Sequence, residues 1–172
     1  MGGPVDCKRC PSHVRGKLLT GKEANMALLT GFLLAATLGV FHHFAILFIR
    51  LFTPHLGEQK HRGILTAFLG LLLVHTIEII AYAAAYKIMI DAAWWGSLTG
   101  DFDGSFYDLI YFSGINFATL GYAQVSTDGA IRMVAMMQAL GGFMVITWSA
   151  TFIYTIWQDV MDHHWRLTQE DE

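Results

Sequence analysis

The sequence predicts an all-α membrane protein in which three long hydrophobic helices cross the bilayer and a shorter segment enters it without crossing. Of the 172 residues, 54% are hydrophobic and 15% are charged, whereas about a quarter of a typical soluble domain is charged. Three long stretches contain two or fewer charged residues each. The net charge of −3 is too small to indicate a nucleic-acid partner. These observations exclude an ordinary soluble domain.

The first hydrophobic segment covers residues 26–49 and contains no charged residue. At a rise of about 1.5 Å per residue, a helix of this length crosses a hydrocarbon core of about 30 Å. The segment is too long for a cleaved signal peptide, and no small-residue cleavage site follows it before Arg50. We therefore expect a spanning helix between a polar N-terminal segment, residues 1–25, and a polar turn, residues 50–62.

A second span is predicted at residues 63–90, where Glu78 and Lys87 are the two charged residues. A long lysine side chain near the end of a span can reach the headgroup region, so Lys87 is compatible with crossing. The residues that follow, 91–105, are rich in Asp, Gly and Trp. This composition favours a loop at the membrane interface.

A third span is predicted at residues 133–158, which contain no charge and end at Asp159. We expect a polar C-terminal tail from this point, residues 159–172. Residues 26–158 then form one transmembrane domain.

The segment at about residues 105–125 is apolar and aromatic in its first half, but it is too short to cross the membrane and return as two helices. We expect a short re-entrant helix followed by an extended loop that contains glycine. Such a loop is tolerated at membrane depth only where it is buried in protein or lines a water-filled path. This layout between two spans is typical of an ion pore.

The stretch YFSGINFATLGYAQV, residues 111–125, resembles the pore loop of potassium channels, where an aromatic-rich helix precedes the filter pattern T-[TV]-[VL]-G-Y-G-D. The residues that match the filter are Thr119, Leu120, Gly121 and Tyr122, while Ala123 stands in place of the last glycine and Gln124 in place of the aspartate. The third span resembles the inner helix of this family, with Gly141 and Gly142 at its hinge. The resemblance covers about residues 103–157 and, more distantly, residues 75–86, which are similar to the outer helix of small bacterial members.

The resemblance implies a homotetramer in the cell membrane, because one loop supplies only a quarter of a pore. Carbonyl oxygens of residues 119–123 would replace the hydration shell of potassium, the bound and transported ion. Gly121 would supply a left-handed backbone conformation, and the Thr119 hydroxyl would form the innermost ion site. The expected partners are the lipid bilayer and identical subunits. No cofactor and no enzymatic activity are expected.

Ala123 and Gln124 leave a second interpretation open within the channel class. An alanine held in a left-handed conformation costs on the order of 1–2 kcal/mol per chain. Gln124 lacks the carboxylate that usually braces the filter. The alternative is therefore a nonselective or nonconducting pore.

His75 and Glu78 lie three residues apart, hence on one face of the second span. A charged carboxylate in mid-membrane costs at least about 2.5 kcal/mol, so we expect Glu78 to be neutral, paired with His75, or facing protein. The pair is either a polar contact that joins helices or a proton or gating sensor. We favour the packing interpretation.

A hypothesis from another class is a membrane b-type haem protein, in which His42 or His43 and His75 bind the iron from two helices. Adjacent helical residues point about 100° apart, so His42 and His43 cannot both face one ligand. Haem binding would also leave residues 119–123 without a role. We therefore prefer the channel.

Cys7, Cys10 and His13 form the pattern C-x-x-C-x-x-H, which offers three ligands where a structural zinc ion needs four. No fourth ligand is evident nearby, and we expect an incidental cluster in a polar terminus.

The orientation in the membrane involves a conflict. A filter that opens outward places the N-terminus outside when there are three spans. Five basic residues precede residue 26, however, and the positive-inside rule would place them in the cytoplasm. If residues 26–49 lie along the membrane, the conflict disappears. We prefer three spans with the N-terminus outside, because the uncharged segment is long.

Overall fold

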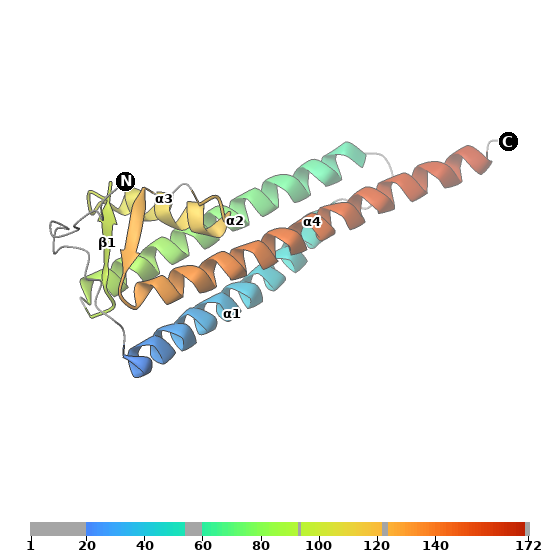
Figure 1. Cartoon of the computed structure of the whole chain (residues 1–172). Helices are drawn as coiled ribbons and strands as arrows, with labels where there is room; N and C mark the ends of the chain where they lie inside the picture. Colours follow the sequence, from blue (N-terminus) through green and yellow to red (C-terminus); the bar gives the residue numbers. More distant parts are fainter. Residues whose placement is uncertain (1–19, 54–59, 93, 122–123, 171–172) are drawn as a thin grey trace, which may run out of the picture.

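The computed structural model describes residues 20–53, 60–92, 94–121 and 124–170, which form three long helices, one short helix and two short strands (Figure 1). The elements in chain order are α1 (Gly21–Phe52), α2 (Lys60–Asp91), β1 (Ser97–Gly100), α3 (Phe106–Phe117), β2 (Val125–Asp128) and α4 (Ile131–Glu170). Helices α1 and α4 run in the same direction and α2 runs against them (Figure 1).

The three long helices have the length and composition needed to cross a membrane, over Gly21–Phe52, Arg62–Asp91 and Ile131–Asp159. The predicted fold class is therefore confirmed, and the first hydrophobic segment is a long helix like the other two. The start of α1 and the end of α4 lie at opposite ends of the bundle (Figure 1). The side of the membrane that each end faces stays a prediction.

All three long helices extend beyond the predicted hydrophobic segments, and the extension is largest at the start of α1 and at the end of α4. Helix α1 begins at Gly21 because Thr20 forms a capping box: its hydroxyl accepts from the Glu23 N–H, and the Glu23 carboxylate accepts from the Thr20 N–H. Helix α4 continues to Glu170, because the polar segment after Asp159 contains neither glycine nor proline to end it. Most of the expected tail is therefore helical.

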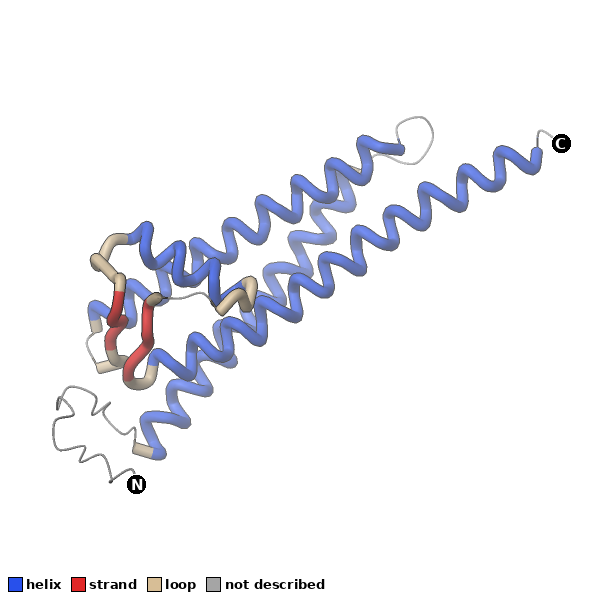
Figure 2. Tube along the Cα trace, turned by 45° about the horizontal axis from the view of Figure 1, so that its top comes forward, coloured by secondary structure: helices blue, strands red, loops and turns tan. Residues whose placement is uncertain are grey.

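A two-stranded sheet replaces part of the interfacial loop expected at residues 91–105. Strands β1 and β2 pair antiparallel, from Ser97 opposite Asp128 to Gly100 opposite Val125. Strands of four residues are too short for alternation to be evident in a sequence. The sheet joins the chain before α3 to the chain after it, so α3 and the following loop form one closed segment (Figure 2).

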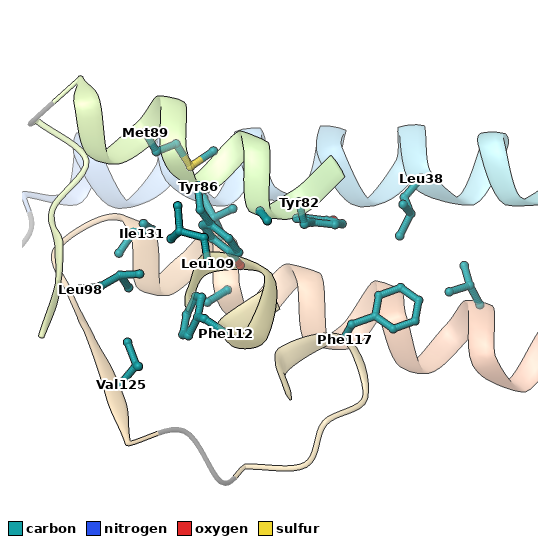
Figure 3. Packing of buried hydrophobic residues seen from close by; sticks show 14 residues of the cluster. Leu38, Tyr82, Tyr86, Met89, Leu98, Leu109, Phe112, Phe117, Val125 and Ile131 are labelled. Atoms are coloured by element: carbon teal, nitrogen blue, oxygen red, sulfur yellow. The ribbon is translucent and has the colours of Figure 1, made fainter. Parts of the chain in front are cut away.

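Helix α3 begins where Ser105 accepts a hydrogen bond from the Asp108 N–H at 3.1 Å. The Ser105 N–H in turn donates to the Asp103 carboxylate at 2.7 Å, and this bond lowers the pKa of Asp103. With 12 residues, α3 is about 18 Å long and cannot cross a core of about 30 Å. It packs against α2 and α4 (Figure 3).

Two apolar clusters hold the helices together, with polar side chains between them. The first surrounds α3 and includes Tyr86, Leu109, Phe112, Phe117 and Ile131 (Figure 3). The second lies farther from the sheet and joins α1, α2 and α4 through Ile46, Ile49, Ala67, Leu71, Val74, Phe152 and Ile156. His42 lies one turn from a member of each cluster, Leu38 and Ile46. On α2, Glu78 likewise lies one turn from Val74 of the second cluster and one turn from Tyr82 of the first.

Candidate functional site

The turn that ends α3 leads into the predicted filter. The Thr119 N–H donates to Asn116 at 3.1 Å and the Leu120 N–H donates to Ile115 at 3.0 Å, which is the Schellman arrangement. Glycine usually occupies the left-handed position of this motif, but here it is Thr119, with φ of 54°. A left-handed conformation costs about 1–2 kcal/mol for a residue with a side chain. Backbone strain of this kind clusters at functional sites.

The predicted filter residues that the structure describes are exposed in the single chain. Thr119, Leu120 and Gly121 follow one another at the surface, and Leu120 is 56% exposed. Gly121 has φ of 69°, as the need for glycine predicted. Tyr122 and Ala123 lie outside the described residues.

The C-terminal end of α3 lies against the middle of α4. A Cβ added at Gly142 would overlap the Phe117 carbonyl oxygen and lie 2.9 Å from the Phe117 Cα, so only glycine allows this approach. Gly142 comes 11 residues after the start of α4, a distance of about 16 Å along the helix. If the hydrocarbon core begins at the start of α4, the end of α3 lies about halfway across its thickness of about 30 Å.

The predicted hinge residues lie inside one continuous helix, since α4 is helical through Gly141 and Gly142. A Cβ added at Gly141 would lie 3.2 Å from the Ala35 Cβ, so this glycine faces α1. Gly142 instead faces α3. The hinge stays a prediction, and close packing is an observed role of Gly142.

A buried hydrogen-bond network fixes α3 to both neighbouring spans. The Gln138 amide donates to the Ser113 hydroxyl at 2.8 Å and to the Ser113 carbonyl at 3.1 Å. The Ser113 hydroxyl donates to the Ile79 carbonyl at 2.8 Å, and the Tyr86 hydroxyl donates to the Gln138 Oε1 at 2.6 Å. This network was not predicted from the sequence. A glutamine inside an uncharged span was the signal that could have indicated it.

A second buried network joins the three spans and lies farther from the sheet than the first network. The predicted contact of His75 and Glu78 is present, with 2.9 Å between the His75 Nδ1 and the Glu78 Oε2. His42 from α1 contacts the other carboxylate oxygen, with 2.9 Å between its Nδ1 and the Glu78 Oε1. The Ser149 hydroxyl of α4 lies 3.1 Å from the His42 Nε2 and 3.0 Å from the His75 Nε2. The four side chains form a closed ring, which we call the His–Glu–His–Ser ring.

The ring does not have the geometry of a haem or metal site. Axial imidazoles of a haem point their nitrogens at the iron from opposite sides, whereas the His42 and His75 rings stack face to face, with centroids 5.3 Å apart. The ligand atoms of His42, His75 and Glu78 lie within 4.8 Å of one another, but a metal ion lies in the plane of each imidazole that binds it. Two stacked planes inclined by 15° cannot share one ion. His43 is exposed and contacts Phe44 and Trp148 instead.

Helix α4 exposes three threonines among large apolar side chains on the side that faces away from the other helices. Its buried residues beyond Gly142 include Val145, Ser149, Phe152 and Ile156. The other side carries exposed hydroxyl groups at Thr147, Thr151 and Thr155. These threonine hydroxyls donate within the helix, which leaves acceptor oxygens on this face. Large apolar side chains are exposed on all three long helices, and on α4 they include Phe143, Met144 and Trp148. The helices α1 and α2 expose no comparable row of threonines along the part of the chain that the structure describes.

Cys7, Cys10 and His13 lie outside the described residues, so the interpretation of this cluster stays a prediction.

The re-entrant helix, the glycine-containing loop at its end and the two flanking spans define a pore-loop membrane protein. Residues 69–159 match the family described as "Ion channel", over just over half of the 172-residue chain. The chain therefore belongs to this ion channel family and functions in ion transport across a membrane, as the resemblance implied. The match runs from α2 to Asp159 in α4, so α1 lies outside it. No curated protein and no solved structure matches the chain.

Proposed function

We propose that the chain is the subunit of a homotetrameric potassium channel, in which four loops of residues 119–123 surround the ion path. The observation that carries this proposal is the strained, exposed turn at Thr119, which follows the contact of α3 with Gly142. We expect this turn at mid-membrane depth, because Gly142 lies 11 residues after the start of α4. Exposed non-helical backbone at this depth needs protein or water beside it. Identical subunits around a water-filled axis supply both.

The exposed face of α4 supports the same assembly. The hydroxyl groups of Thr147, Thr151 and Thr155 continue for more than two turns beyond the level of the filter. When four copies turn this face toward a common axis, the acceptor oxygens border a hydrated cavity and the apolar faces of α1 and α2 contact lipid. The same hydroxyl oxygens turned toward lipid would lose their interactions with water.

The electrostatic field of α3 favours cations on this axis. The C-terminal end of a helix carries roughly half a negative elementary charge. In each subunit this end comes directly before Thr119 and contacts Gly142, and we expect it near the middle of the membrane. The α4 span, residues 133–158, carries no charged side chain that would oppose this field.

Ala123 and Gln124 favour one alternative, a pore with weak or no potassium selectivity. Glycine at position 123 would relieve the left-handed strain that we expect there. The strength of the preference for potassium over sodium is therefore the property that distinguishes the two candidates.

The test is the flux of potassium and of sodium into liposomes that contain the purified full-length chain. A selective channel passes potassium in preference, loses current with Gly121→Ala and keeps or raises its selectivity with Ala123→Gly. A nonselective pore passes both ions, and a nonconducting one gains current only with Ala123→Gly. Absence of flux from the wild type and from Ala123→Gly would refute the channel, and cross-linked species other than a tetramer would refute the assembly.

A further inference from the structure

The His–Glu–His–Ser ring is a closed chain of four hydrogen bonds, and each of these bonds needs one proton. Two bonds join the Glu78 carboxyl group to the Nδ1 atoms of His42 and His75. The other two join the Ser149 hydroxyl to the Nε2 atoms of the same imidazoles. A ring in which all four bonds are made therefore holds four protons.

Four protons also make the ring electrically neutral. The serine hydroxyl supplies one proton, so one imidazole donates to Ser149 and the other accepts from it. The imidazole that accepts must donate its Nδ1–H to Glu78. The fourth proton lies between the other imidazole and the carboxyl group, which gives either a carboxylic acid with two neutral histidines or a carboxylate with one imidazolium. Both forms have a net charge of zero.

Because the ring is buried inside the bundle, a net charge on it is unfavourable, and this fixes the number of protons at four. The side chains of His42 and Glu78 are fully buried, and Ser149 is nearly so. A fifth proton would place two hydrogens in one of the four bonds and leave a net positive charge, whereas a ring of three protons would be negative and would lack one bond. A net charge in the middle of a membrane is unfavourable. The neutral ring is therefore the form that holds the three spans together.

The surroundings do not supply a compensating charge. The groups near the ring are Tyr82 of α2, which is buried and interacts electrostatically with Glu78, and the exposed His43 of α1. From α3 and α4 the ring meets the aromatic side chains of Phe117 and Trp148. Among the described residues of α3 and α4, no acidic or basic side chain contacts the ring.

We propose that His42, His75, Glu78 and Ser149 form one proton-binding site, which is closed and neutral with four protons and opens the junction of α1, α2 and α4 when a proton is gained or lost. His75 is the accessible member, because its side chain is 19% exposed while those of His42 and Glu78 are at 0%. The His75 ring also packs on Phe117, with centroids 5.4 Å apart. Opening the ring therefore loosens the contact that holds the end of α3.

The proton count predicts how stability depends on pH. In the unfolded chain, Glu78 is ionised above its ordinary pKa of about 4.3, and each histidine gains a proton at about pH 6.5. Above pH 6.5 the unfolded groups bind one proton fewer than the ring, so stability falls as pH rises. Below pH 6.5 they bind one proton more, so stability falls as pH decreases. The contribution of the ring is thus greatest near pH 6.5.

Stability plotted against pH thus has an alkaline limb, where it falls above about pH 6.5, and an acid limb, where it falls below. Two variants separate these limbs. Glu78→Gln keeps all four bonds, because the amide donates to one imidazole and accepts from the other, but it cannot take up the extra proton on folding. This variant therefore loses the alkaline limb and keeps the acid limb. His75→Gln leaves one titrating imidazole, so folding still takes up a proton at high pH but releases none at low pH. This variant loses the acid limb.

The experiment is denaturant unfolding of the full-length chain in detergent, from below to above about pH 6.5, with His43→Gln as the control. His43 is an adjacent, exposed imidazole outside the ring, so its replacement should leave both limbs of the wild-type profile. Relative to Glu78→Gln, the unfolding equilibrium constant of the wild type should rise about tenfold per pH unit on the alkaline side. Equal alkaline slopes for these two proteins would overturn the proposal, even if His75→Gln does not fold.

The effect on conduction rests on the proposed channel function and has its own measurement. Potassium flux of the wild type should fall on both sides of about pH 6.5, and the two variants should each lose one side of this dependence. A stability profile with both limbs but no flux at any pH would refute the proposed function and support the ring. Flux without either limb in the stability profile would refute the ring and leave the channel.

Discussion

Replacement of Gly142 by alanine tests whether the position of α3 depends on close contact with α4. The new Cβ would overlap the Phe117 carbonyl oxygen and lie 2.9 Å and 3.0 Å from the Phe117 Cα and carbonyl carbon. These are backbone atoms, so the contact is relieved only if the end of α3 moves away from α4. Since Thr119 follows two residues later, the filter loop would move with it.

The magnitude follows from two opposing terms. Alanine favours the helical conformation over glycine by about 1 kcal/mol, whereas overpacking a well-packed site costs about 1–3 kcal/mol. Gly39→Ala is the matched control, because Gly39 is also helical and its added Cβ would meet nothing within 4 Å. The helix term is the same in both variants. The difference in their free energies of unfolding should therefore equal the overpacking cost, about 1–3 kcal/mol.

The assay combines denaturant unfolding with cation flux in liposomes. Gly142→Ala should be less stable than Gly39→Ala and should lose flux or selectivity, while Gly39→Ala should conduct like the wild type. Gly141→Ala distinguishes contact from hinge bending, since its Cβ meets the Ala35 Cβ at 3.2 Å and needs a shift of only a few tenths of an ångström. Loss of flux in both Gly141→Ala and Gly142→Ala would favour the hinge. Equal stability of Gly142→Ala and Gly39→Ala, with normal flux, would refute the reasoning.

The remaining predictions concern hydrogen bonds in and near the spans. Glu78→Gln should keep wild-type assembly and flux near neutral pH, because the amide can both donate and accept; loss of the assembled species in size-exclusion chromatography would contradict this. Gln138→Leu should destabilise the chain by about 1–3 kcal/mol, because the buried Tyr86 hydroxyl loses its acceptor while the Ser113 hydroxyl keeps its bond to the Ile79 carbonyl, and unchanged denaturant unfolding would disprove it. Thr20→Ala should cost about 1 kcal/mol through loss of the cap, detectable as faster hydrogen exchange in the first turn of α1 and nowhere else.

The spans and the re-entrant helix could be predicted from the sequence because the membrane imposes them locally. An uncharged segment of more than 20 residues must satisfy its backbone hydrogen bonds internally, which makes it a helix whatever surrounds it. The contact of His75 with Glu78 was predictable for the same reason, since residues three apart on a helix share a face. The resemblance of residues 111–125 to a pore loop indicated the family, and the match over residues 69–159 bears this out.

The partners that these residues meet on other helices were decided only by the tertiary structure. Nothing in the sequence near His42 or Ser149 indicates that both belong to one hydrogen-bonded ring with His75 and Glu78. His42 and Ser149 are separated from His75 by 33 and 74 residues. The hydrogen bond of Gln138 to Ser113 also depends on how α3 and the spans pack. So does the close contact of Gly142 with the Phe117 backbone. Local sequence determines where a helix forms and which residues share a face. The helix that each face meets is determined by packing among segments far apart in the chain, which no local pattern records.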